Sequence, residues 1–233
     1  MSLPILHSSA RFLVVDKPAG WLSVPGRDTT DPSIQAALSQ ELCGQVWPVH
    51  RLDREVSGLI LFAKDAKAHR EANSWFEQRR VHKFYEAWTE VGAPGVSAER
   101  SRDPHREGAV EEWTSKLLRG KRRAYESPHG KPAQTRVQWL GPGRWLDAPV
   151  QRWLVEPLTG RPHQIRCEFF RHGYPILGDT LYGASGQFLA DSIALRAVRL
   201  DFSDCPSARD LGLPERIEAK GLEAYAAEAY GAR

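Results

Sequence analysis

Apolar residues recur along the chain in patterns that are typical of strands. The run Leu59 to Ala63 lies between Gly58 and Lys64 and is too short for a helix, so it predicts a buried strand at 58–64. Residues 82–91 alternate strictly between two faces, which predicts a strand with Tyr85 near its start. Similar runs predict strands at 11–16, 133–140, 151–156 and 193–202, with Gly141-Pro142-Gly143 as a turn. The sheet is therefore expected to be large.

Helix signals lie between these strands. Asp31 followed by Pro32 predicts a helix start, and the helix is expected to end near Gly44. Asp65 is expected to cap a second helix, because apolar residues follow it at helical spacing. A third helix is expected from 159–162 to Gly173, and an Ala-rich helix from 214 to 230.

Two segments lack these periodic patterns. Residues 92–131 are rich in Gly, Pro, Ser and charge, which predicts extended loops with short pieces of strand. Residues 173–183 are expected to form a loop whose glycines and proline fix the backbone. No repeat and no long linker is present. We therefore expect a single domain over 1–233, with a polar, largely helical tail at 205–233.

The charge distribution is compatible with a surface that binds a polyanionic partner and equally with solvated charged faces; charge alone does not decide between them. The net charge is +3, but residues 201–233 hold seven acids and four bases, which leaves +6 for the rest. Basic residues concentrate at 79–83, 116–123 and 161–171, as a phosphate-contacting surface requires. Aromatic residues, including eight Trp, offer stacking partners or simply build the core.

Composition excludes several other classes. Three distant cysteines give neither a disulfide framework nor a zinc motif, and the histidines have no metal-ligand spacing. No apolar run approaches the roughly 18 residues of a membrane span. The first residues also lack the features of a signal peptide. We expect a cytoplasmic protein without a membrane segment, metal or cofactor.

Asp53 is the most informative acid in the chain. It precedes a predicted buried strand and is flanked by Arg51 and Arg54. Neighbouring guanidinium groups favour the ionised carboxylate, which suits a nucleophile or a charge-stabilising group better than a proton donor. Considered without the rest of the chain, the arrangement favours an ordinary structural ion pair.

Five segments in one order resemble the signature blocks of RluA-type pseudouridine synthases, the enzymes that isomerise uridine in structured RNA. The resemblance covers most of residues 10–200. The blocks are Val15 to Gly20, His50 to Asp53 with Ser57 to Leu59, Lys83 to Ala87, Gly160 to Arg166, and Gly173 to Asp179. One block alone is weak, whereas five in family order are specific.

The resemblance implies the fold, the activity and the nucleophile. The fold class is α/β (α+β), with a mixed, mainly antiparallel sheet, flanking helices and a central catalytic cleft. The reaction is isomerisation of uridine to pseudouridine in ribosomal or transfer RNA stem-loops, without a cofactor, with Asp53 as the catalytic aspartate and base flipping for access. Attack on the sugar, attack on the base and removal of a sugar proton all remain open.

Other site residues follow from the same blocks. Tyr85 is expected to pack on the target base, and Arg166 to pair with Asp53 and hold it ionised. Arg51 is expected to reach into the RNA as a wedge. Arg54 is left with a structural role. The remaining expected substrate-binding residues are His50, Arg161, His163 and Ile165, with Lys121, Arg122 and Arg123 of the basic run at 116–123 along the RNA backbone.

The chain also departs from the family pattern. Val56 replaces a frequent threonine, and Arg196 stands where relatives often have histidine. The chain begins almost at the catalytic blocks, so we expect no small N-terminal RNA-binding domain. Two alternatives stay open: a catalytically silent RNA-binding protein, and a carboxylate-dependent glycosidase or nucleoside hydrolase. The latter usually needs two matched carboxylates, and no second acid has a comparable setting.

Overall fold

The computed structural model describes residues 3–26, 30–91 and 108–231. Their contacts divide the chain into two compact units. Unit 1 consists of Met1–Lys83, Ala190–Ser192 and Arg196–Gly221, and unit 2 of Phe84–Leu189, Ile193–Leu195 and Leu222–Arg233. The chain therefore passes between the units five times.

The sheet of unit 1 is built around the two apolar runs. Its strands follow the order β1 (Ile5–Ser8), β2 (Phe12–Lys17), β4 (Ser57–Ala63) and β10 (Leu195–Asp201). The short strands β3 (Trp47–Pro48) and β11 (Arg216–Glu218) pair with β4 and β10. The β4–β10 pair is parallel and the other pairs are antiparallel. Every residue of β4 is buried, as the continuous apolar run predicts.

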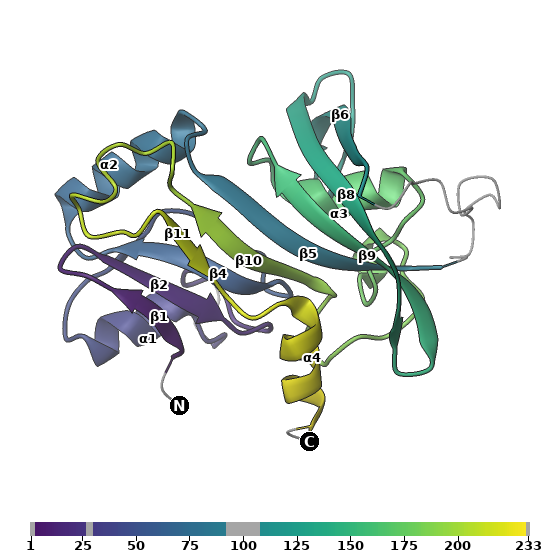
Figure 1. The fold of residues 1–233 in the computed structure, drawn as a ribbon, viewed down its shortest axis with the longest axis horizontal. Coiled ribbons are helices and arrows are strands. Elements are labelled where there is room, and N and C mark those ends of the chain that lie inside the picture. Colours follow the sequence, from purple (N-terminus) through teal and green to yellow (C-terminus); the bar gives the residue numbers. More distant parts are fainter. Residues whose placement is uncertain (1–2, 27–29, 92–107, 232–233) are drawn as a thin grey trace. The chain divides into compact units, whose positions relative to one another are not determined.

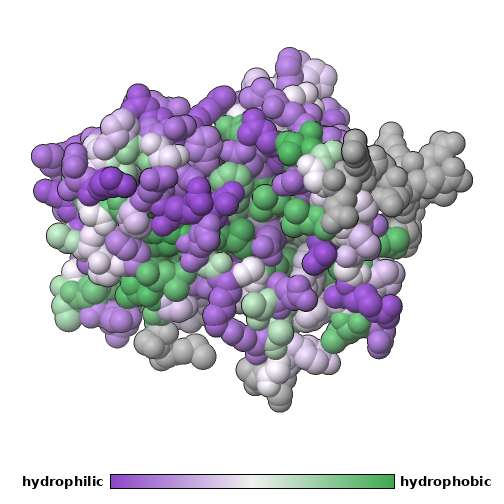
Figure 2. Space-filling model, in the orientation of Figure 1, coloured by the Kyte–Doolittle hydropathy of each residue, from purple (hydrophilic) through white to green (hydrophobic). Residues whose placement is uncertain are grey.

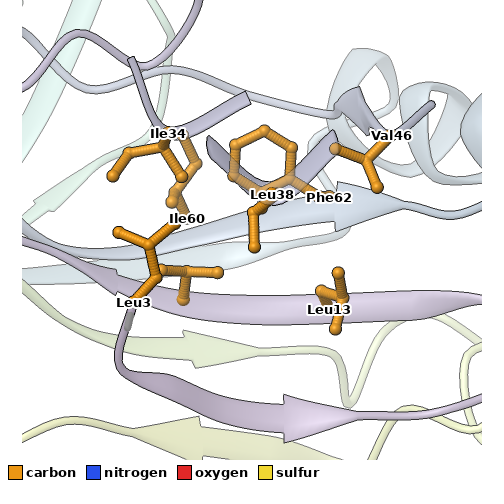
Figure 3. Packing of buried hydrophobic residues seen from close by; sticks show 8 residues of the cluster. Leu3, Leu13, Ile34, Leu38, Val46, Ile60 and Phe62 are labelled. Carbon is orange, nitrogen blue, oxygen red and sulfur yellow. The ribbon is translucent and has the colours of Figure 1, made fainter. Parts of the chain in front are cut away.

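Two helices cover opposite faces of this sheet, because consecutive strand residues point to opposite sides. Helix α1 (Ile34–Glu41) packs in one cluster with Leu13, Val15, Ile60 and Phe62. Figure 3 shows Ile34 and Leu38 of α1 beside Leu13, Ile60 and Phe62. Helix α2 (Ala66–Glu77) packs on the other face, where Trp75 meets Phe12 with ring centroids 5.9 Å apart. The outward side of α2 is hydrophilic (Figure 2).

The helix caps show one correct and one wrong sequence prediction. The Asp65 carboxylate accepts hydrogen bonds from the backbone N–H groups of Lys67 and Ala68, so it caps α2 as predicted. Helix α1 is capped by Ser33, whose hydroxyl accepts from Ala36 N–H, and not by Asp31. Pro32 thus precedes the cap, and the helix begins two residues after it.

Unit 2 is an antiparallel sheet with one helix against it (Figure 1). The strand order is β5 (His82–Glu90), β9 (Ala148–Pro157), β8 (Lys131–Trp145), β6 (Val110–Arg119) and β7 (Ala124–Glu126). Helix α3 (Gln164–Arg171) contacts β6, β7, β8 and β9. Phe169 of α3 lies edge-on to Trp113 and Trp153, at centroid distances of 5.1 and 5.5 Å. The 3-10 helix η1 (Thr180–Tyr182) and helix α4 (Leu222–Gly231) complete the unit.

In unit 2, the prediction of loops with short pieces of strand at 92–131 is partly wrong, and the turn predicted at 141–143 is wrong. Within 92–131, β6 is a ten-residue strand, because its residues alternate in burial and pair with β8 along their length. Residues 92–107 lie outside the described chain. Gly141-Pro142-Gly143 is not a turn but the end of β8, paired with Arg152 to Val150 of β9, and the hairpin turns at Leu146 and Asp147. Gly141 has φ +100°, and the pairing of β8 with β9 has a bulge between Trp139 and Gly141. Beyond Gln138, the last β8 residue that pairs with β6, strand β8 continues with β9 alone.

The C-terminal prediction is partly wrong. Residues 216–218 form strand β11 beside β10, and the helix begins only at Leu222. The other predicted elements are confirmed with boundary shifts of a few residues, including the loop after Gly173, which has φ +83°. Because β4 and β10 pair in parallel and the other pairs described above are antiparallel, the fold class is mixed and mainly antiparallel, as expected.

Candidate active site

Asp53 lies in a tight turn immediately before β4 of unit 1. It is partly buried, and its backbone carbonyl accepts a hydrogen bond from Val56 N–H at 3.2 Å. Strand β4 begins one residue later, at Ser57. The carboxylate is thus carried by a turn whose far end is anchored in a fully buried strand.

Gly58 explains why the chain can enter β4 directly after this turn. Its φ is +111°, a conformation that favours glycine. A Cβ atom at this position would lie 2.2 Å from the carbonyl oxygen of Ala197 on β10. Gly58 and Ala197 are paired in register in the parallel β4–β10 ladder. Only a residue without a side chain permits this approach, so Gly58 fixes the path of the chain out of the Asp53 turn.

The turn is also fastened to the segment that follows β2. The Ser23 hydroxyl donates to the carbonyl of Leu52 at 2.8 Å and accepts from Leu52 N–H at 3.0 Å. Gly20 N–H donates to the carbonyl of Arg54 at 2.9 Å. These three bonds hold the residues on both sides of Asp53, which limits the movement of its carboxylate.

Lys17 makes the third connection to the turn. Its fully buried ammonium group donates to the carbonyls of Pro18, Trp21 and Arg54, at 3.0, 2.8 and 3.2 Å. Burial lowers the pKa of Lys17 from 10.5 to about 7, opposed by the negative charges of Glu55 and Asp53. Sequence reasoning placed Lys17 in a signature block but gave it no role. Its signal was a lysine at the end of an otherwise buried strand.

His50 has contacts that support a positioning role. Its Nε2 accepts a hydrogen bond from Leu61 N–H at 3.0 Å, and its ring stacks on Phe76 at 5.0 Å. Burial, with a smaller effect of the Lys83 charge, lowers the pKa of His50 from 6.5 to about 3. The neutral imidazole therefore completes the hydrogen bonding of β4. Its expected contact with RNA stays a prediction.

The two arginines beside Asp53 have different surroundings. Arg51 is exposed and takes part in no hydrogen bond or ion pair within the described residues. Arg54 is half-buried, and its guanidinium lies 3.5 Å from the Asp191 carboxylate. Arg51 is thus available to a partner, whereas Arg54 has a structural contact, which agrees with the role expected from the sequence.

Unit 2 carries the other two residues that the resemblance names as catalytic. Tyr85 is buried on β5, opposite Val155 of β9. Arg166 is 3% exposed, and its Nε and Nη2 donate to the two carboxylate oxygens of Asp179 at 2.7 and 2.8 Å. This bidentate pair fixes the guanidinium plane. Because Asp53 belongs to unit 1, its expected pairing with Arg166 stays a prediction.

The head of α3 is organised by Gln164, which sequence reasoning did not single out. Its side chain accepts from Thr159 Oγ1 and Arg161 N–H, and donates to the Gln134 carbonyl and Thr135 Oγ1. A buried amide with four partners is a strong constraint on the preceding loop.

The three expected substrate-binding residues beside Gln164 differ in burial and contacts. His163, with φ +50°, occupies the N-cap position without a capping side-chain bond. The side chain of Arg161 donates to the carbonyl of Pro132, and Ile165 is 7% exposed.

The basic run divides into two kinds of residue. Lys121, Arg122 and Arg123 are all exposed, but only Arg123 has hydrogen-bond or cation–π contacts with other side chains or carbonyls among the described residues. Arg123 donates to the Leu181 carbonyl at 3.1 Å, and its guanidinium lies over the rings of Phe170 and Tyr182, at 5.6 and 5.8 Å. The Arg123 side chain is thus held against Phe170, Leu181 and Tyr182 of unit 2.

Two kinds of feature are absent from the described residues. Across the described ranges no group of three or more His, Cys, Asp or Glu side chains is arranged to hold a metal ion. Within the same ranges, no helix has the length and apolarity needed to cross a membrane.

Comparison with known proteins agrees with these features. The family model described as RNA pseudouridylate synthase matches residues 11–170. The "Dual-specificity RNA pseudouridine synthase RluA" of Vibrio vulnificus (strain CMCP6) is 31% identical over 204 residues, covering 85% of this chain and 76% of the relative. The protein of the same name from Escherichia coli (strain K12) is 33% identical over 207 residues, covering 85% of each chain.

A solved structure shows the same fold. The chain of "Human RNA Pseudouridylate Synthase Domain Containing 1" matches with a TM-score of 0.69 at 23% identity, covering 94% of this chain and 82% of the other. The mixed sheet is therefore that of a pseudouridine synthase. The chain belongs to the family of RNA pseudouridylate synthases, enzymes that isomerise uridine to pseudouridine in RNA.

Proposed function

We propose that Asp53 is the nucleophile of this isomerisation. The observation that supports it most is the restraint of the turn. Ser23, Gly20 and Lys17 bond to the backbone of Leu52 and Arg54, on both sides of a partly exposed carboxylate. A nucleophile held in place by its neighbours loses little freedom when the substrate binds, which lowers the barrier to attack.

The reaction needs no net oxidation and no second substrate. The bond between N1 of uracil and C1′ of ribose breaks, and a bond between C5 and C1′ forms. C5 loses its proton, and N1 gains one, so atoms and electrons balance. As the proposed nucleophile, the Asp53 carboxylate attacks either the sugar or the base; in the alternative route it acts as a base instead and removes a sugar proton to release uracil. In each route the carboxylate is regenerated at the end.

Tyr85, Arg166 and Arg51 have proposed roles beside Asp53. Tyr85 packs on the flipped base, and Arg166 keeps the Asp53 carboxylate ionised and oriented. Arg51 occupies the space that the flipped nucleotide leaves, which its exposure supports. Replacing Tyr85 with Phe should retain RNA binding. Full activity of Tyr85→Ala would contradict the proposed contact with the base.

The proposed substrates are stem-loops of ribosomal and transfer RNA. The relatives carry the name dual-specificity RNA pseudouridine synthase, which supports more than one RNA target. A target uridine in a loop is easier to flip out than one in a duplex, because fewer stacking contacts are lost.

Gene deletion with complementation tests this proposal. Pseudouridines in ribosomal and transfer RNA are mapped in the deletion strain by chemical reverse-transcription stops. We expect at least one position to lose its pseudouridine and to regain it with the wild-type gene but not with Asp53→Ala. Restoration by Asp53→Ala at the wild-type level would refute the nucleophile. Persistence of every pseudouridine in the deletion strain would refute the proposed targets.

A further inference from the structure

Tyr182 links the basic turn of unit 2 to the arginine of the signature helix. Its hydroxyl accepts a hydrogen bond from Ala124 N–H at 2.8 Å and donates to the carbonyl of Ala124 at 3.0 Å. Ala124 is the first residue of β7 and directly follows Arg123. The Tyr182 hydroxyl thus provides hydrogen-bond partners for both the N–H and the carbonyl of Ala124, as a neighbouring strand otherwise would.

The ring of Tyr182 contacts two guanidinium groups. The Arg123 group lies 5.8 Å from the ring centroid, and the Arg166 group lies 5.4 Å from it. Arg166 is fixed in turn by its bidentate pair with Asp179. Cation–π contacts of this kind favour a defined ring position, most strongly where water is excluded.

Water is excluded from this position. Tyr182 is 1% exposed and packs in a buried cluster with Leu117, Ala133 and Cys167. Burial raises the pKa of the Tyr182 hydroxyl, so it remains a hydrogen-bond donor at physiological pH. The cluster joins β6, β8 and α3, and these elements therefore define where the Tyr182 hydroxyl lies.

The four residues Gly120 to Arg123, here called the cationic turn, are held at one end by this link. Gly120 N–H closes the turn by donating to the carbonyl of Arg123 at 2.9 Å. Arg123 is docked on Leu181, Phe170 and Tyr182. Lys121 and Arg122 are exposed and form no ion pair within the described residues. The turn therefore presents two cations from a fixed base.

We propose that Tyr182 is a positioning residue for RNA: it fixes the cationic turn through Ala124 and Arg123, so that Lys121 and Arg122 meet the phosphate backbone of the substrate. That the phosphate backbone belongs to RNA follows from the proposed function, and the proposal for Tyr182 rests on it in this respect. Arg123 serves as the anchor of the turn. Because phosphate contacts release counterions, the salt dependence of RNA binding reports how many cations are correctly placed.

The test compares salt dependence in four proteins and one control variant. The dissociation constant for purified unmodified transfer RNA is measured from about 50 to 200 mM salt for wild type, Tyr182→Phe, Lys121→Ala/Arg122→Ala, and the triple variant. Tyr182→Phe keeps the ring and loses the hydroxyl bonds to Ala124 together with the 3.4 Å contact between the hydroxyl and His163 Nδ1. Tyr230→Phe in α4 is the matched control. Circular dichroism establishes that each variant is folded.

We expect Tyr182→Phe to reduce the slope of log K against log salt by about one to two, as the double charge variant does. Adding Tyr182→Phe to the double variant should change the slope no further. In assays of pseudouridine formation, KM should rise about tenfold while kcat stays within about twofold. A slope equal to that of wild type in folded Tyr182→Phe would overturn the proposal.

A second variant keeps the test decisive if Tyr182→Phe does not fold. Arg123→Lys retains the charge but loses the planar guanidinium that contacts two rings. The same reduction in slope is expected, and an unchanged slope would overturn the proposal. Pseudouridine formation by wild type is measured separately, so its absence refutes the proposed function without deciding the role of Tyr182.

Discussion

The amine of Lys17 connects the end of β2 with the turn that carries Asp53. Three carbonyl oxygens surround it, and one of them belongs to Arg54, the residue after Asp53. Each such bond contributes about 1 kcal/mol net and more when the donor is charged. Burial opposes the charge and lowers the pKa of Lys17 from 10.5 to about 7. The site thus holds a lysine whose protonation changes near neutral pH.

This pKa predicts a pH dependence of stability. Between pH 7 and 10.5 the unfolded chain binds more protons at Lys17 than the folded chain does. The free energy of unfolding therefore rises with pH in this window, by at most about 1.4 kcal/mol per unit. Denaturant titrations of wild type and Lys17→Met should show a difference that moves in favour of wild type from pH 7 to 10.

The matched control for that comparison is Lys64→Met. Lys64 is a partly buried lysine in the same unit, and it donates to Ser8 Oγ and the Ser9 carbonyl rather than to the turn. It controls for the loss of one positive charge. A constant difference between wild type and Lys17→Met across the window would contradict the lowered pKa.

At the scale of elements, the sequence predicted what local patterns determine. The strand at 58–64, the strand at 82–91 and the helix after Asp65 are present because burial period and capping are local signals. Strand β6 was missed because its pairing with β8 stabilises it, and a long-range partner is invisible in its polar sequence. Gly141-Pro142-Gly143 was misjudged for a related reason: a bulge lets β8 continue through turn-forming residues.

The candidate site was predictable to the same extent. The five blocks identified Asp53, but the residues that restrain its turn depend on contacts between segments that are distant in sequence. Ser23 lies 29 residues from Leu52, and Lys17 lies 37 from Arg54. Tyr182, which is 58 residues from Ala124, was missed for this reason.

Gly58 lies at the junction between the Asp53 turn and β4, and its close approach to β10 predicts that one added methyl group lowers the stability of the protein. Gly58→Ala places a Cβ atom 2.2 Å from the Ala197 carbonyl oxygen and requires a φ of +111°. We expect a loss of about 3 kcal/mol or more in the free energy of unfolding, measured by urea titration. Gly44→Ala is the control, because its nearest contact would be an ordinary 3.6 Å. A loss below about 1 kcal/mol for Gly58→Ala would contradict the steric argument.

At the scale of the whole molecule, the two units are interleaved along the chain. The path crosses between them five times, and both β5 and β10 contribute residues to each unit. Unfolding of either unit therefore releases both ends of segments that belong to the other. This favours cooperative unfolding, whereas the single domain expected from the sequence stays a prediction.

Calorimetry tests this expectation. We expect one transition with a calorimetric enthalpy equal to the van't Hoff enthalpy, which is the signature of two-state unfolding. The same scan on Gly58→Ala should show one transition at lower temperature. Two resolved transitions in wild type, only one of them shifted by Gly58→Ala, would show that the units unfold independently.

Release of tritium from RNA labelled at C5 of uridine tests the central claim most directly. Formation of the bond between C5 and C1′ expels the C5 proton, so each turnover releases one label into water. Purified wild type should release tritium from unmodified ribosomal or transfer RNA. Asp53→Asn should bind the same RNA with similar affinity and release none. Release by Asp53→Asn at the wild-type rate would contradict a nucleophilic Asp53.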